Sequence, residues 1–110
     1  MGPVDRFTQR LAAPPPPPRE VTLEFVRGHL ADGETLDDLQ VAIRRGVAVN
    51  PRPYLQARDG LSAYLALDLP EGELAHLVAW EANRALHDPT DVGARRFLAA
   101  VLELLRAGLA

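Results

Sequence analysis

The C-terminal stretch from residue 93 to residue 110 places the strongest constraint on the fold. On a helix, where successive residues turn by about 100°, its large apolar side chains fall within one broad arc and its charged side chains gather on the opposite side. The apolar set is Phe97, Leu98, Val101, Leu102, Leu104, Leu105 and Leu109, and the charged set is Arg95, Arg96, Glu103 and Arg106. An apolar arc of this width needs cover on two flanks. We therefore expect a C-terminal helix that packs against other helices of the chain or against a second copy.

The size and composition of the chain fit one small domain. A length of 110 residues is typical of a single domain, and 47% hydrophobic with 25% charged residues is ordinary for a globular protein. The chain has no cysteine, which excludes disulfides and thiolate metal ligands. The N-terminal residues lack a secretion-signal pattern, and no apolar run approaches the roughly 18 residues of a spanning helix. We expect a cytoplasmic protein without a membrane partner.

Residues 1–19 differ in composition from the rest of the chain, because they end in five consecutive prolines, Pro14 to Pro18. Proline fixes the backbone angle φ and lacks an N–H group, so such a run favours the extended polyproline II conformation. We expect a flexible, proline-rich arm over residues 1–19, which acts as a spacer. A single helical domain is then expected over residues 20–110.

Helix signals begin early in this domain. Thr22 is a possible N-cap for a helix over residues 21–30, which we favour although the alternation within residues 20–26 also fits a strand. Thr35 and Asp38 form a capping box at the start of a helix over residues 35–45. Gly46 is placed to end that helix.

The middle of the chain is rich in helix formers. Asn50 is a candidate N-cap followed by Pro51 at the first helical position. Asp59-Gly60 is a hairpin signal, and residues 61–69 alternate as a strand would. The absence of valine, isoleucine and threonine from residues 54–69 nevertheless favours a helix, bent or broken near Gly60.

Another helix is predicted over residues 71–87, and the turn at residues 88–91 supplies caps for the C-terminal helix. Together these segments predict an all-α fold, an antiparallel bundle of four to five helices. A small α+β fold with a hairpin around residues 59 and 60 is the alternative.

The helix predicted over residues 71–87 carries the most unusual surface. Its small and apolar residues form one side, and the other side displays His76, Trp80, Asn83, Arg84 and His87. Tryptophan and arginine dominate the hot spots of protein interfaces. We therefore predict a non-enzymatic protein-binding domain that uses these five residues and self-associates through the C-terminal helix or its neighbour. In the competing interpretation, Trp80 packs under the proline tract or a loop.

Catalytic and cofactor motifs give no support for an enzyme. Glu73 and His76 match one Glu-x-x-His element of di-iron bundles, but such sites need a second copy of the element. Ser62, the only serine, lacks the Gly-x-Ser-x-Gly context of a nucleophile elbow, and glycine-rich phosphate loops are absent. We predict no catalytic residue, no metal and no cofactor.

Nucleic-acid binding through residues 35–58 is the alternative function. A helix ending near Gly46 and another starting at Asn50-Pro51 resemble, over about twenty residues, the helix-turn-helix of winged-helix regulators. The resemblance implies that the polar residues of this corner contact DNA, namely Arg44, Arg45, Arg52, Gln56 and Arg58. A net charge of −3 and the position of Pro53 early in the second helix argue against it.

Overall fold

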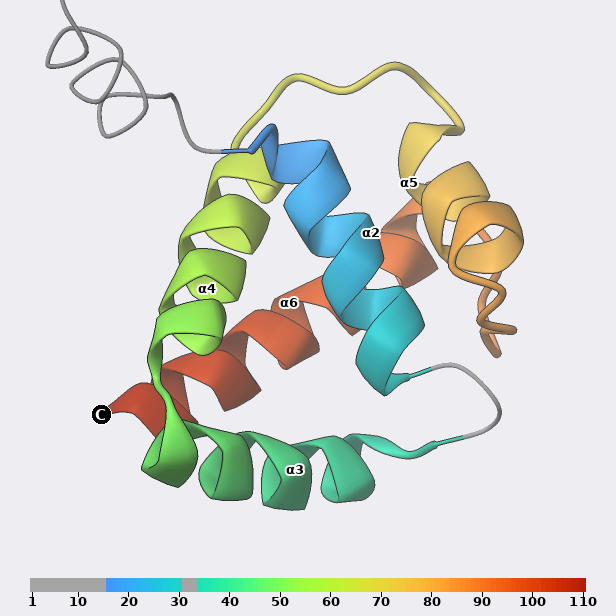
Figure 1. The fold of residues 1–110 in the computed structure, drawn as a ribbon. Coiled ribbons are helices and arrows are strands. Elements are labelled where there is room, and N and C mark those ends of the chain that lie inside the picture. Colours follow the sequence, from blue (N-terminus) through green and yellow to red (C-terminus); the bar gives the residue numbers. More distant parts are fainter. Residues whose placement is uncertain (1–15, 31–33) are drawn as a thin grey trace, which may run out of the picture.

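The computed structural model describes residues 16–30 and 34–110, and the regular elements of these residues are all helices. In chain order they are α2 (Pro18–His29), α3 (Leu36–Val49), α4 (Arg52–Leu65), α5 (Glu73–His76), the π-helix η1 (Leu77–Glu81) and α6 (Asp91–Leu109) (Figure 1). The all-α bundle is confirmed, and the described residues contain no strand at the position of the alternative hairpin. Residues 1–15, most of the expected proline-rich arm, lie outside the described residues. No helix in the described part of the chain is both long enough and apolar enough to cross a membrane.

Helix α6 lies at the centre of the fold, where α3, α4 and α5 pack against it (Figure 1). Leu98, Val101 and Leu105 of the expected apolar arc are fully buried, and the four charged residues of the opposite side are exposed. The hydroxyl of Thr90 caps the helix by accepting a hydrogen bond from the amide of Gly93, at 3.3 Å. The C-terminal helix is therefore confirmed, and other helices of the same chain cover its apolar arc.

Helices α2 and α4 lie side by side and run antiparallel (Figure 1). Gly60 lies inside α4 at their contact, where the Cβ of any other residue would come within 2.5 Å of the Val21 Cγ1 atom. The predicted bend or break near Gly60 is therefore wrong. Glycine serves at this position to bring two helices together, and α4 runs unbroken to Leu65.

The capping box of α3 is confirmed: the Thr35 hydroxyl accepts from the Asp38 amide at 3.1 Å, and the Asp38 carboxylate accepts from the Thr35 amide at 3.0 Å. The predicted helix end at Gly46 is wrong, because α3 continues to Val49. The phenol of Tyr54 occupies the space where a side chain at residue 46 would lie. As at the α2–α4 contact, the glycine permits close packing and does not end the helix.

The starts of α2 and α4 differ from the expected ones by a few residues. Helix α2 begins at Pro18, so Thr22 lies inside it and is buried, and its predicted role as N-cap is wrong. Helix α4 begins at Arg52 with Pro51 in the N-cap position. Asn50 still supports this start, since its side-chain oxygen accepts from the Arg52 amide at 3.2 Å.

Candidate functional site

The segment that carries the tryptophan is helical, as predicted, but it is shorter than the predicted range of residues 71–87, and both predicted ends are wrong. The helical part begins at Glu73 and ends at Glu81. In its second half the backbone hydrogen bonds follow the π-helical pattern, which joins residues five positions apart. The amide of Ala82 donates to the carbonyl of Leu77 at 2.8 Å. Residues 83–90 form no helix.

Asn83 ends this helical segment. Its φ of 54° lies in the left-handed region, which asparagine enters more readily than most residues, and helices commonly end on such a residue. The next amide, that of Arg84, turns back and donates to the carbonyl of Val78 at 2.9 Å. Asn83 is the sequence signal for this helix end, and the apolar spacing, which continues through residues 85 and 86, conceals it.

Trp80 lies on the outer side of η1 with 78% of its surface exposed. His76, one helical turn earlier, is also exposed, whereas Leu77 and Val78 face the core and are fully buried. The structure therefore brings His76 and Trp80 together on one outward side, which we call the Trp80 surface. The described residues do not cover the indole, in contrast to the interpretation that a loop packs over it.

The other three residues of the expected face do not extend this helical stripe, because they follow the helix end. Asn83 and His87 are exposed in the irregular segment before α6. Arg84 turns inward: its Nη1 donates to the carbonyl of Leu30 at 3.1 Å and to that of Glu34. Of the five predicted contact residues, only His76 and Trp80 share a helix face.

The side chain of Arg84 connects three parts of the chain. Leu30 follows the C-terminus of α2, Glu34 precedes α3, and the guanidinium carbon lies 5.5 Å from the centre of the Phe97 ring of α6. This distance is within the range of a cation–π contact. The contacts assign Arg84 an internal role in joining α2, α3 and α6.

A charged network attaches the helical segment to α2 and α4. Arg19 donates from Nε to Glu73 Oε1 at 2.6 Å and from Nη1 to Glu81 Oε1 at 3.2 Å, and the Tyr64 hydroxyl donates to Glu73 Oε1 at 3.0 Å. The hydrogen bonds from Arg19 lower the pKa of both glutamates. Burial, and then the hydrogen bond to Glu73, raises the pKa of Tyr64. Sequence spacing does not reveal this network, because Arg19 lies 54 positions before Glu73 and within the expected arm.

The same network bears on the Glu-x-x-His element. The Glu73 carboxylate is occupied by Arg19 and Tyr64 rather than turned toward His76 as a ligand pair. Within the described residues, no three histidine, aspartate or glutamate side chains are grouped closely enough to hold a metal ion.

Two further contacts fix the ends of the segment. Asp91 accepts from the amides of Gly72 at 2.6 Å and Ala75 at 3.0 Å, and these hydrogen bonds lower the pKa of its carboxyl group. At the other end, Arg27 donates from Nε and Nη2 to the carbonyl of Glu81, at 3.1 and 2.6 Å. The backbone under the Trp80 surface is therefore held from both ends.

The residues of the alternative DNA-binding prediction lie where α3 meets α4. The exposed members are Arg44, Arg45, Arg52 and Gln56. Arg58 is half-buried and forms an ion pair with Asp59 at 3.0 Å. Only residues 50 and 51 separate the two helices, so the turn is shorter than expected from a helix end at residue 46.

Comparison of the chain with protein-family models, with curated proteins and with solved structures finds no match.

Proposed function

We propose that this chain is a non-enzymatic protein-binding domain that contacts its partner through the Trp80 surface. The observation that carries the proposal is the 78% exposure of the only tryptophan. An exposed indole is a large apolar area in contact with water, and tryptophan is enriched among the residues that contribute most to interface affinity.

The way the indole is supported strengthens the proposal. The short helical segment beneath it is fixed by Arg19, Arg27 and Asp91, so its backbone is ordered before a partner arrives. Ordering a surface on binding costs free energy, and a surface that is already rigid avoids part of that cost. His76 beside the indole adds a polar group that can orient the partner.

The first experiment captures partners of the full-length tagged chain from a lysate of the source organism, with and without nuclease. We expect a defined protein that survives nuclease treatment. Trp80 is the only tryptophan of this chain, so once the emission of the purified partner alone is subtracted, burial of the indole should shift the remaining emission to shorter wavelength.

Trp80→Ala is the decisive variant. Loss of a buried indole contact should weaken partner binding by about 2 kcal/mol or more, roughly 30-fold, with unchanged helical circular dichroism. Val49→Ala is the matched control, since Val49 is 88% exposed and lies in α3, outside this surface. If both variants bind as the unchanged chain does, the Trp80 surface is not the contact.

If the partner is a second copy, sedimentation will show a concentration-dependent dimer that Trp80→Ala removes.

DNA binding at the α3–α4 corner is the second candidate function. It is favoured by three exposed arginines, Arg44, Arg45 and Arg52, which form no ion pair with a carboxylate of the described residues. Arginines that contact phosphates release counterions, so binding should weaken steeply with salt and should fall in Arg52→Ala. Captured material that disappears with nuclease would favour this function over the first one.

A further inference from the structure

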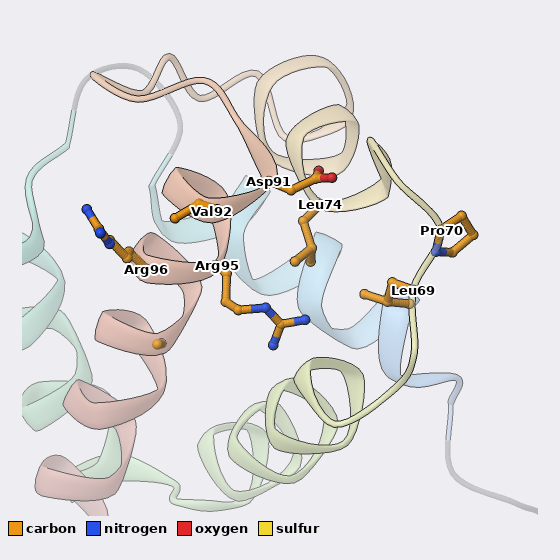
Figure 2. A pocket seen from close by; sticks show the side chains of 8 residues that line it. Leu69, Pro70, Leu74, Asp91, Val92, Arg95 and Arg96 are labelled. Carbon is orange, nitrogen blue, oxygen red and sulfur yellow. The ribbon is translucent and has the colours of Figure 1, made fainter.

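A groove of about 330 Å³ lies between the N-terminal half of α6 and the segment that leads from α4 to α5 (Figure 2). Its volume is at the lower end of the range for small-molecule sites. Most of its wall is apolar and consists of Leu69, Pro70, Leu74, Val92 and Ala99. The Trp80 surface shares none of these residues, so the groove is a separate feature of the molecule.

Charge at the groove comes from three residues of α6. Arg95 and Arg96 line it together with Asp91. Both carboxylate oxygens of Asp91 already accept from backbone amides, those of Gly72 and Ala75. Two arginines and one aspartate give the groove a net charge of +1 beside its apolar wall.

Arg95 is the better placed of the two cations. One of its guanidinium nitrogens donates to the carbonyl of Leu65 at 2.9 Å, which fixes the side chain at the end of α4. In Figure 2 the side chain extends from α6 toward Leu69 and Leu74. A guanidinium has five N–H donors in a planar fork, so several remain for an anionic group.

We propose that this groove binds a small molecule with an aliphatic chain and a single carboxylate. The chain lies on Leu69, Leu74 and Val92, and the carboxylate receives hydrogen bonds from Arg95. Apolar burial supplies affinity, and the charged pair fixes the orientation of the ligand. This inference does not rest on the protein-binding function, because neither His76 nor Trp80 lines the groove.

Decanoate is the probe for the test, used below the concentration at which it forms micelles and followed by amide chemical shifts of the full-length chain. We expect saturable shifts around residues 69–75 and 91–99. Decyltrimethylammonium, with the same chain and the opposite charge, should bind at least about tenfold more weakly, since the excess charge of the groove is positive.

Two variants test the assignment independently. Arg95→Gln removes the cation and should weaken decanoate binding at least about tenfold. Ala99→Phe fills the groove from an exposed position of α6 and should abolish binding while Arg95 is intact. Arg106→Gln is the control, because Arg106 is exposed near the far end of the same helix and pairs with Glu103.

Four results would overturn the proposal. The cationic probe could bind as tightly as decanoate, or decanoate affinity could be unchanged in both Arg95→Gln and Ala99→Phe. The chemical-shift changes caused by decanoate could be centred outside the groove. The chemical shifts of the groove could also change with protein concentration in the absence of any probe. The last result would show that a second copy occupies the groove.

Discussion

Helix α6 and the α5–η1 segment are fixed in the molecule by different kinds of contact. In α6 the buried side chains are apolar along most of its length, and the charged residues point to solvent. The α5–η1 segment buries only Leu74, Leu77 and Val78, and its remaining attachments are hydrogen bonds from distant parts of the chain. Because a nine-residue segment offers little apolar area, polar contacts decide where it lies. The outward-facing indole of Trp80 is therefore positioned by residues 19, 27 and 91.

The largest effect expected from this comparison is in α6. Leu98→Ala removes a fully buried side chain from the central helix and should lower the free energy of unfolding by about 2–5 kcal/mol, as measured by urea denaturation. Leu67→Ala is the matched control, because Leu67 is 50% exposed and should change stability by less than about 0.5 kcal/mol. Similar losses in the two variants would mean that α6 is not the centre of the core.

An intermediate effect is expected at the polar connection through Arg84. Arg84→Met keeps much of the side-chain volume but leaves the carbonyls of Leu30 and Glu34 without their charged donor, which should cost about 2 kcal/mol in urea denaturation. The control is Arg106→Met, whose exposed ion pair is worth little. If Arg84→Met is as stable as that control, Arg84 is free to contact a partner, as the sequence suggested.

The smallest effect is expected at Arg19, and it should depend on pH. Arg19→Met should lower the melting temperature by a few degrees at neutral pH, because the pairs with Glu73 and Glu81 are partly exposed. Arg19 lowers the pKa of both carboxyl groups below 4.5, so their contribution is present above that pH and is lost as the pH falls through the lowered values. The difference in melting temperature between Arg19→Met and the unchanged chain should therefore shrink in acid. A constant difference would show that Arg19 acts through packing alone.

Local signals were enough to predict much of the fold. The capping box of Thr35 and Asp38, the cap at Thr90 and the apolar arc of α6 each depend on residues within a few positions of one another. Periodicity also identified Leu98, Val101 and Leu105 as core residues before any partner helix was known. The all-α class follows from these elements.

The wrong predictions concern residues whose role is set by distant parts of the chain. Gly46 and Gly60 resemble helix ends in sequence, but they accommodate Tyr54 and Val21 across helix contacts. Arg84 resembles a contact residue, but its partners are 54 and 50 positions earlier in the chain. At the candidate site, the exposure of Trp80 and the neighbouring His76 could be anticipated from spacing, whereas the network that supports them could not.

The glycines inside α3 and α4 also affect how the molecule loses its structure. A glycine within a helix lowers the intrinsic stability of that helix by about 1 kcal/mol relative to alanine. Each of the two helices therefore depends on the close packing contact that its glycine allows. Without its contact with α2, α4 would lose much of the stabilisation that keeps it helical. Secondary structure and side-chain packing should therefore disappear together on heating, in one cooperative transition without a compact helical intermediate.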